Sequence, residues 1–334
     1  MSTNKMLEVD EIDGVGPAIA TKLLQAGYST VQAVASAPLK ELLEKTKLGD
    51  EAAKKIVRAA RVMMHYDQLT TGLDIYQRRK EAEKLTTGVK ALDAILQGGI
   101  ETQSMTELCG EYATGKSQVC LLLSVMAHLP REKGGLGGKA VFIDTEGTFR
   151  PERVYQIAQQ RGLDPEAALS NIYYARAMTS DHQTNLVETL GDLVVKENVR
   201  LVIVDSIISH FRSEYLGREC LSERQQKLNR HLHMLLRLAE MYNLAVVLTN
   251  QTQANPQAFF GDPNRPAGGN VLSHGTTHRL YLRKRAGARV ATIMDSPSLP
   301  PNEAMFQITT KGIEDVDETQ RKRIKATEAD PEQD

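Results

Sequence analysis

A loop with the composition of a phosphate-binding site runs from Gly110 to Ser117. Its sequence, Gly-Glu-Tyr-Ala-Thr-Gly-Lys-Ser, fills every fixed position of the pattern G-x-x-x-x-G-K-[ST]. The glycines let backbone N–H groups close around the oxygens of a nucleoside triphosphate, Lys116 can reach the terminal phosphates, and the Ser117 hydroxyl can bind Mg²⁺. An ordinary glycine turn is the alternative. It is disfavoured because a strand-like segment precedes the loop and an apolar, helix-like run follows it.

Three polar residues follow apolar runs elsewhere in the chain, at Glu146, Asp205 and Gln251. In phosphate-loop proteins, an aspartate placed like Asp205 holds the magnesium shell opposite the loop hydroxyl. Glu146 can orient and deprotonate an attacking water, although an acid that caps the helix predicted at Pro151 is the alternative. The Gln251 amide can bond the terminal phosphate and report hydrolysis to the loop that follows.

Two segments that we expect at the same sheet edge combine cations, aromatic residues and glycines. They are Ser209–Arg218, which Arg224 extends, and Thr252–Asn270. Bases stack on aromatic rings and phosphates attract cations, so we expect single-stranded DNA to bind there, although each alone is more often a plain surface loop. The candidate DNA contacts in this region are Arg212, Arg218, Arg224, Phe259, Phe260, Arg265, Gly268 and Gly269.

Strand and helix patterns alternate along the central part of the chain. This order predicts a mostly parallel sheet with helices on both faces, followed by hairpin-type strands. The expected strands are Ala140–Asp144, Asn171–Tyr174, Leu201–Asp205, Leu244–Asn250, Arg279–Arg283, Arg289–Met294 and Met305–Thr309. The expected helices are Pro151–Arg161, His182–Glu197 and Ser222–Tyr242.

The first sixty residues have the composition of a compact helical module. Ile12–Tyr28 resembles the helix-hairpin-helix motif, in which hairpin N–H groups and a following helix N-terminus grip a DNA phosphate without reading bases. Gly14 and Gly16 would allow the close approach, and Lys22 could add charge. A weaker second copy is expected at Leu48–Ile56. A small helical interaction domain with a tight turn is the alternative.

A linker joins this module to the core. Within it, Leu69–Ile75 has strand character without a partner in its own domain, so we expect it to add to the sheet edge of a neighbouring copy. The charged run Gln77–Lys84 is interpreted as a solvated helix. The expected divisions are 1–62 for the helical module, 63–84 for the linker with its polymerisation segment, 85–316 for the α/β core, and 317–334 for a charged tail expected to be disordered.

Composition narrows the possible partners. The 334 residues carry a net charge of -1, so there is no global field to attract nucleic acid or an anionic membrane, and any DNA contact must come from local clusters. The cysteines Cys109, Cys120 and Cys220 are odd in number and lack metal-ligand spacing, which indicates reduced thiols. With no recognisable signal peptide or membrane span, we expect a cytoplasmic protein without a membrane partner.

Together these motifs resemble those of the RecA-like recombinases, and among them the archaeal RadA type. The resemblance covers nearly the whole chain and includes the phosphate loop, Phe142–Arg153, Thr249–Gln251, Ala258–Pro263, Arg279–Arg283 and Asp295–Pro300. It implies a RecA-like phosphate-loop core with a mostly parallel central sheet, preceded by a small all-α helix-hairpin-helix domain. It also implies a DNA-dependent ATPase that uses ATP and Mg²⁺, forms filaments on single-stranded DNA, and exchanges strands with a homologous duplex during recombinational repair.

The resemblance assigns further residues. Arg150 would stack near the adenine, Asp295 and Pro300 would cap ATP from the next copy, and His274 would sense the terminal phosphate across that interface. The catalytic residues would be Glu146, Lys116 and Gln251, and the metal ligands Ser117 and Asp205. The nucleotide-binding loop would comprise Gly110, Glu111, Tyr112, Ala113, Thr114, Gly115, Lys116, Ser117 and Gln118.

The chain departs from the family in its polymerisation element, a Phe, two residues and an Ala. Here that position reads Leu69-Thr-Thr-Gly72. The smaller Leu forfeits apolar contact worth on the order of 1 kcal/mol, so we expect weaker assembly without DNA. Rings and open filaments both remain possible for a head-to-tail interface.

Two other functions share this core: a recombination mediator that exchanges strands poorly, and a ring-shaped helicase motor. The intact Glu146, Gln251 and both candidate DNA loops argue against the mediator. The helical module and the cap at Asp295–Pro300 argue against the helicase. Mediator proteins are further expected partners.

Overall fold

The computed structural model describes residues 7–254 and 264–317. Phe259, Phe260 and the predicted tail beyond Asp317 therefore lie outside the described residues. The chain divides into two compact units, Met1–Glu81 with Val187–Lys196, and Ala82–Leu186 with Glu197–Asp334. In the described part of the chain, every helix is too short or too polar to cross a bilayer.

The first unit is built from helices. They are η1 (Val9–Glu11, a 3₁₀ turn), α1 (Pro17–Gln25), α2 (Val31–Ser36), α3 (Leu39–Thr46), α4 (Asp50–Met63), α5 (Gly72–Arg79) and most of α11 (Leu190–Glu197). In α4 the buried residues Ala53, Ile56, Val57 and Ala60 repeat at helical spacing and form one apolar face. This face packs into a small core of its own that includes Leu23.

Two tight turns join helices in this unit. Gly14 has φ +86°, a conformation that favours glycine, and Gly16 is the N-cap residue of α1. The element before this turn is only the 3₁₀ turn η1, where an α-helix was expected. The second turn lies between α3 and α4, with Lys47 in the left-handed region and Gly49 as N-cap. It occupies the position predicted for a second hairpin.

The strand predicted at Leu69–Ile75 is wrong from Gly72 onward, because α5 begins there. Thr71 and Asp74 form a capping box: the Asp74 N–H donates to Thr71 Oγ1 at 3.2 Å, and the Thr71 N–H donates to Asp74 Oδ2 at 3.0 Å. These bonds satisfy backbone donors at the helix start and outweigh the β-branched composition. The helix predicted over Gln77–Lys84 also differs, since α5 ends at Arg79.

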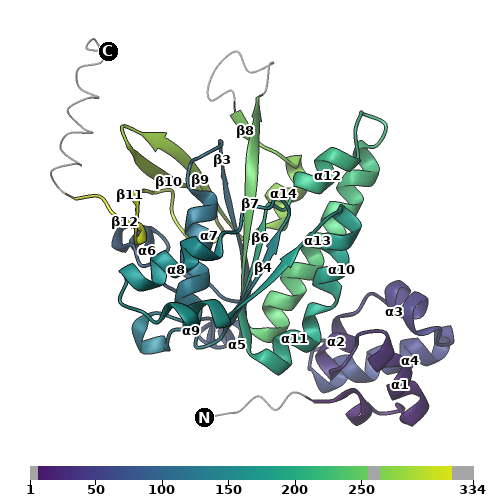
Figure 1. The fold of residues 1–334 in the computed structure, drawn as a ribbon. Coiled ribbons are helices and arrows are strands. Elements are labelled where there is room, and N and C mark those ends of the chain that lie inside the picture. Colours follow the sequence, from purple (N-terminus) through teal and green to yellow (C-terminus); the bar gives the residue numbers. More distant parts are fainter. Residues whose placement is uncertain (1–6, 255–263, 318–334) are drawn as a thin grey trace. The chain divides into compact units, whose positions relative to one another are not determined.

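The second unit contains a ten-stranded sheet in the order β12-β11-β10-β9-β3-β7-β6-β4-β5, with β8 paired to β7 (Figure 1). Its strands are β3 (Ser104–Gly110), β4 (Lys139–Asp144), β5 (Ile172–Arg176), β6 (Val199–Asp205), β7 (Ala245–Ala254), β8 (Asn264–Pro266), β9 (His278–Arg285), β10 (Ala288–Asp295), β11 (Glu303–Thr309) and β12 (Gly312–Asp315). A separate pair joins β1 (Lys84–Leu85) and β2 (Ile100–Glu101). Strands β5, β4, β6, β7, β3 and β9 run parallel, whereas β9 to β12 are antiparallel. The predicted mostly parallel sheet with terminal hairpins is confirmed.

Helices cover both faces of this sheet (Figure 1). They are α6 (Lys90–Ile95), α7 (Lys116–Ala127), η2 (Arg131–Lys133), α8 (Pro151–Gln160), α9 (Pro165–Ser170), α10 (Ser180–Glu188), α12 (Ser209–Glu214), α13 (Leu221–Tyr242) and α14 (Gly269–Gly275). Consecutive β6 residues Ile203 and Val204 are both fully buried, and neighbouring strand residues point to opposite faces. Burial of both requires cover on each side. The helix predicted over His182–Glu197 is instead two helices, α10 and α11.

Two predicted loops contain regular structure. Strand β7 continues to Ala254, four residues beyond the predicted end at Asn250, and pairs antiparallel with β8. Residues at the start of the predicted segment Thr252–Asn270 therefore pair with residues 264–266 of the same segment, and together they form a two-stranded β-ribbon. The other segment, Ser209–Arg218, starts with helix α12.

The parallel register brings the strand ends that carry polar residues to one edge of the sheet. Gly110 at the end of β3 lies opposite Gln251 on β7. Asp144 at the end of β4 lies opposite Asp205 on β6. The carboxyl ends of parallel strands are the usual position of a site in open α/β sheets.

A buried histidine makes stability depend on pH. His231 on α13 is fully buried, with its Nε2 atom 3.2 Å from the Gln183 amide nitrogen and its ring 5.9 Å from that of Phe211. Burial lowers the pKa of His231 to about 4. The unfolded chain therefore takes up the proton first as pH falls, so stability is complete above about pH 6.5 and declines as pH falls towards 4.

We expect wild type to lose about 2 kcal/mol more unfolding free energy between pH 7.5 and pH 5 than His231→Gln, which cannot ionise at this position. Urea denaturation at both pH values, followed by circular dichroism, measures the difference. Equal losses in the two proteins would show that His231 does not carry this pH dependence.

Candidate functional site

The loop between β3 and α7 is fixed by close packing as well as by its glycines. A Cβ atom added at Gly110 would lie 2.3 Å from the carbonyl oxygen of Leu282, so no larger residue fits. Gly115 has φ +102° and is the N-cap residue of α7. Thr114 is buried and its hydroxyl donates to the Glu111 carbonyl at 2.9 Å. The loop therefore leads directly into the N-terminus of α7, and backbone N–H groups at a helix N-terminus can bind phosphate.

A pocket of about 850 Å³ opens over this loop. Its lining is Glu111, Tyr112, Ala113, Gly115, Lys116, Ser117, Gln118, Glu146, Thr148, Arg153, Asp205, Ser206, Thr249, Gln251, Thr252, Arg289 and Ile308. The structure therefore brings most of the predicted phosphate loop together with Glu146, Asp205 and Gln251. The pocket is large enough for a nucleotide.

Lys116 lines this pocket. Its Nζ atom donates to the carbonyl oxygens of Gly110 at 2.8 Å and Glu111 at 2.7 Å. Burial lowers the pKa of Lys116, while the nearby carboxylates of Asp205 and Glu146 act in the opposite direction. The ammonium group is thus held on the loop, within reach of an anion bound there.

Asp205 and Ser117 form an oxygen-rich corner of the pocket. One carboxylate oxygen of Asp205 accepts the Thr249 hydroxyl, and Asp205 Oδ2 is buried without a hydrogen-bond partner among the described residues. Burial raises the pKa of Asp205, and hydrogen bonds from Thr249 and Ser117 oppose that shift. Carboxylate and hydroxyl oxygens are the ligands that Mg²⁺ prefers, and it usually takes few of them from protein when phosphates supply others. The residues present therefore fit a magnesium ion bound with a phosphate.

Consistent with that sparse ligand set, no cluster of three or more His, Cys, Asp or Glu side chains able to hold a metal occurs within residues 7–254 and 264–317. The structure thus gives no support to a metal site built from protein ligands alone in this part of the chain.

Glu146 is an exposed carboxylate that lines the pocket, and two donors fix it. Its Oε1 atom accepts from Ser206 Oγ and from Gln251 Nε2, each at 2.8 Å. These contacts join the loop after β4 to the ends of β6 and β7. A carboxylate held in this way can act as a general base towards a water molecule in the pocket.

Asp144 shapes the loop that carries Glu146. Its carboxylate accepts backbone N–H groups of Glu146 at 2.9 Å, Gly147 at 2.7 Å and Phe149 at 3.1 Å, and pairs with Arg176 at 3.1 Å. Burial acts to raise the pKa of Asp144, but the backbone donors outweigh it and hold the pKa below its usual value. Asp144 is therefore a charged anchor that positions its neighbour.

Sequence reasoning missed several lining residues. Ser206 directly follows Asp205 at the end of a predicted strand, and this position is a sequence signal that could have identified it as a site residue. Arg289 on β10 and Ile308 on β11 come from hairpin strands far along the chain, and no local pattern marks them. The Arg289 Nε atom is buried without a hydrogen-bond partner within the described residues. The lining residues that the sequence analysis did not assign to the nucleotide are Thr148, Arg153, Ser206, Thr249, Thr252, Arg289 and Ile308.

Other predicted nucleotide residues lie outside the pocket of the single chain. Arg150 is exposed at the start of α8, and its Nη1 atom donates to the carbonyls of Gly147 at 3.0 Å and Phe149 at 2.8 Å. His274 on α14, Asp295 at the end of β10, and Pro300 are also exposed. Any role of the last three in binding nucleotide requires a second copy of the chain.

The predicted DNA contacts are spread over several elements. Arg212 lies on α12, Arg218 is exposed in the turn after it, and Arg224 lies in the first turns of α13. Gly268 and Gly269 have positive φ at the start of α14, and the backbone of Arg265 lies in β8. Gly14 and Gly16 belong to the first unit. The predicted polymerisation residues Leu69 and Gly72 are both exposed, Leu69 fully.

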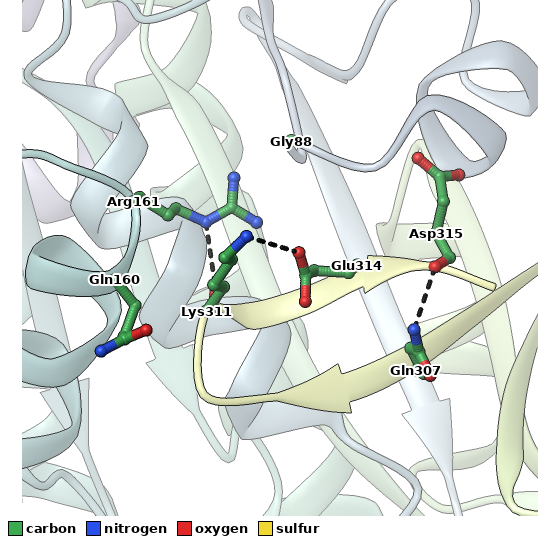
Figure 2. A pocket seen from close by; sticks show the side chains of 7 residues that line it. All are labelled: Gly88, Gln160, Arg161, Gln307, Lys311, Glu314 and Asp315. Atoms are coloured by element: carbon green, nitrogen blue, oxygen red, sulfur yellow. Dashed lines mark hydrogen bonds and ion pairs between the residues drawn. The ribbon is translucent and has the colours of Figure 1, made fainter. Parts of the chain in front are cut away.

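A second pocket, of about 470 Å³, lies beside the β11–β12 hairpin (Figure 2). Arg161 Nε donates to the Lys311 carbonyl at 2.8 Å, and Lys311 Nζ pairs with Glu314 at 3.5 Å. The Asp315 carboxylate accepts the backbone N–H groups of Lys90 at 2.8 Å and Ala91 at 2.9 Å, at the start of α6. The charged groups of this pocket thus connect the β11–β12 hairpin to α6 and to the end of α8, so we assign the pocket a structural role.

Comparison with known proteins supplies the family. The model of the Rad51 family matches residues 78–316, and a model described as a SAM-like helix-hairpin-helix tandem matches residues 6–61. The chain is also similar to the DNA repair and recombination protein RadA of Aeropyrum pernix. The two are 48% identical over 309 residues, which cover 92% of this chain and 97% of the relative.

The contacts of Glu146 predict a separation of binding from hydrolysis. Glu146→Gln keeps the shape of the side chain but removes the base, so we expect hydrolysis of a nucleoside triphosphate to fall by roughly 10²-fold or more with nucleotide affinity nearly unchanged. Steady-state phosphate release and fluorescent-nucleotide titration measure the two quantities. Glu152→Gln, at an exposed acid in the first turn of α8, is the matched control. If Glu146→Gln hydrolysed the nucleotide at the wild-type rate, Glu146 would not be the catalytic base.

Proposed function

The chain belongs to the Rad51 family and is a recombinase of the archaeal RadA type, and from this premise we propose that its pocket binds and hydrolyses ATP with Mg²⁺ to set how firmly it holds DNA. It is a DNA-dependent ATPase of homologous recombination and DNA repair, in a family that binds DNA and forms filaments. The observation that carries the proposal is the single pocket that contains the phosphate loop, Glu146, Asp205 and Gln251.

ATP binds through the phosphate loop. The N–H groups of the loop and of the first turn of α7 bond the phosphate oxygens. Lys116 Nζ exchanges its two loop carbonyls, those of Gly110 and Glu111, for oxygens of the terminal phosphates. Because this ammonium is partly buried, its interaction with the anion is only weakly screened by water.

Ser117 and Asp205 would hold Mg²⁺ beside the phosphates. When bound, the ion would supply positive charge that neutralises phosphate oxygens. Asp205 is held for this task by the Thr249 hydroxyl on the neighbouring strand. Asp205 Oδ2 has no hydrogen-bond partner among the described residues, and Ser117 lines the same pocket.

Glu146 positions and deprotonates the attacking water. Ser206 and Gln251 both donate to the same oxygen, Oε1, so they fix the direction of the carboxylate. The Gln251 amide has a second role, because its bond to Glu146 competes with a bond to the terminal phosphate. The state of the nucleotide thereby determines which partner Gln251 holds, and β7 carries that difference into the segment Thr252–Asn270.

DNA binds along the segments that leave this edge of the sheet. We assign the phosphate contacts to Arg212, Arg218, Arg224 and Arg265, base stacking to Phe259 and Phe260, and close backbone approach to Gly268 and Gly269. Single-stranded DNA occupies this surface first, and a homologous duplex is then paired against it. The helical module, residues 1–62, adds contacts to DNA phosphates through the turn at Gly14 and Gly16.

Neighbouring copies complete the nucleotide site. Asp295 and Pro300 of one copy cap the ATP of the next, Arg150 stacks near the adenine, and His274 contacts the terminal phosphate. Assembly uses the linker, residues 63–84, with Leu69 and Gly72 as contact residues. In this division of the chain, the linker is followed by the core, residues 85–316, and the tail, residues 317–334. Recombination mediators are additional partners that load the protein on DNA.

Strand exchange between homologous single- and double-stranded DNA tests this function. Wild type with ATP should exchange strands, whereas Lys116→Ala should lose nucleotide binding, nucleotide-dependent filaments and exchange together, because the phosphates lose their main cation. Electron microscopy and a gel-based exchange assay provide the readouts, with Lys133→Ala, at an exposed lysine outside the pocket, as control. Unwinding that needs no homology would instead identify a helicase, and ATP binding without exchange would identify a mediator.

The exposed Leu69 predicts weak assembly in the absence of DNA. Leu69→Phe with Gly72→Ala should shift the size distribution towards larger assemblies, since the added ring increases the apolar area buried between copies. Analytical ultracentrifugation without DNA measures the shift. Val62→Phe adds the same kind of surface on exposed α4 and should leave the distribution unchanged. No gain from the double variant would reject the role of this segment.

A further inference from the structure

The centre of the sheet contains a charged pair that ATP hydrolysis does not use. Glu107 on β3 is fully buried and Arg279 on β9 is 7% exposed, with Arg279 Nε 2.5 Å from Glu107 Oε2. Removing two charges from water is costly, and a buried pair is often no more stable than apolar residues of similar size. Stability alone therefore does not explain this buried pair, whose Glu107 lies three residues before the phosphate loop begins at Gly110.

Asn250 extends this pair to the segment that carries the candidate DNA contacts. Its fully buried Nδ2 atom donates to Glu107 Oε1 at 2.7 Å and to the carbonyl oxygen of Ala267 at 2.8 Å. The N–H group of Ala267 donates to the Gln251 carbonyl at 2.8 Å. Both backbone groups of Ala267 are thus bound to consecutive residues of β7.

Arg279 makes a parallel connection to α14. Its Nη1 atom donates to Ser273 Oγ at 2.9 Å, and Ser273 Oγ donates in turn to the carbonyl of Gly269 at 3.2 Å. We call Glu107, Asn250, Ala267, Ser273 and Arg279 the root clamp. It joins three neighbouring strands, β3, β7 and β9, to the segment where the chain returns from the β7–β8 ribbon.

The position of Asn250 in β7, next to Gln251, connects the root clamp to the nucleotide pocket. Asn250 and Gln251 are consecutive in a strand, so their side chains point to opposite faces. Gln251 reaches Glu146 in the nucleotide pocket at 2.8 Å, while Asn250 reaches Ala267 at the same distance. A shift of the β7 backbone at these two residues moves both side chains and therefore acts on both contacts.

We propose that Asn250 is a positioning residue that couples the nucleotide pocket to DNA binding. Through the root clamp it holds Ala267 and α14 in register with the strand end that carries Gln251. The nucleotide-dependent change of partner at Gln251 therefore shifts the DNA-binding segment as a unit. Without the clamp that segment is free to rearrange independently of the pocket. The inference rests on the proposed function and specifies how its two sites communicate.

Two variants test the coupling from opposite ends of the root clamp. Asn250→Ala removes both donors to Glu107 and Ala267, and Ser273→Ala removes the acceptor of Arg279 on the half-buried face of α14. Neither residue lines the pocket. Thr102→Val is the matched control, because Thr102 is a fully buried hydrogen-bonding side chain before the amino end of β3, bonded to Asn243 at 2.6 Å and remote from the pocket lining.

The readouts are ATP hydrolysis with and without single-stranded oligodeoxythymidine, and the affinity for that DNA with ATP and with ADP. In Asn250→Ala we expect DNA-independent hydrolysis within about twofold of wild type and DNA stimulation reduced at least fivefold. The ratio of DNA affinities in ATP and ADP should move towards one. Ser273→Ala should change the same ratios in the same direction by a smaller factor, and Thr102→Val should lower the melting temperature without changing them.

Full stimulation in Asn250→Ala would overturn the proposal. So would a parallel fall of basal and stimulated hydrolysis with the melting temperature, because that pattern belongs to a purely structural residue. If Asn250→Ala does not fold, the ratios in Ser273→Ala decide, and unchanged ratios reject the clamp. If wild type itself shows neither stimulation nor a nucleotide-dependent DNA affinity, the proposed function fails, and the clamp fails with it.

Discussion

Parallel pairing of the central strands is the constraint on which the site depends. Strands β4, β6 and β7 carry polar residues at or near their carboxyl ends, and β3 ends in the first glycine of the phosphate loop. The hydrogen-bond register decides which of these residues face one another. Gly110 is level with Gln251, and Asp144 is level with Asp205. A slip of one residue in either pairing would turn these side chains to the wrong face. The fully buried apolar residues of β6, held from both sides of the sheet, fix that register.

Much of the fold and part of the site could be predicted from the sequence. The phosphate loop is a local pattern, because its chemistry needs consecutive residues, and the strand ends at Asp205 and Gln251 follow clear apolar runs. The parallel sheet with its terminal hairpins also follows from the order of elements. Alternation of strands with helices leaves few other arrangements.

The features that were predicted wrongly have two causes: a local capping signal that was overlooked, and contacts between distant parts of the chain. Leu69–Ile75 has the composition of a strand, yet the bonds between Thr71 and Asp74 start a helix there. Arg289 reaches the pocket only because β10 folds back along β9. The predicted strand at Leu244–Asn250 stops short since pairing with β8, not composition, extends β7. The first case is decided by a local capping box that the sequence itself contains, and the other two are decided by pairing with distant strands.

The capping of α6 by Asp315 has a consequence for biosynthesis. Two backbone N–H groups at the start of the first core helix, those of Lys90 and Ala91, find their acceptor more than two hundred residues later, in the last strand. During translation these N–H groups bond to water, because their protein acceptor is absent until nearly the whole polypeptide has been synthesised. The apolar residues of the first unit that form its own core all lie within the first sixty-four positions, so that core can form much earlier. The helical unit should thus mature while the catalytic core is still being synthesised.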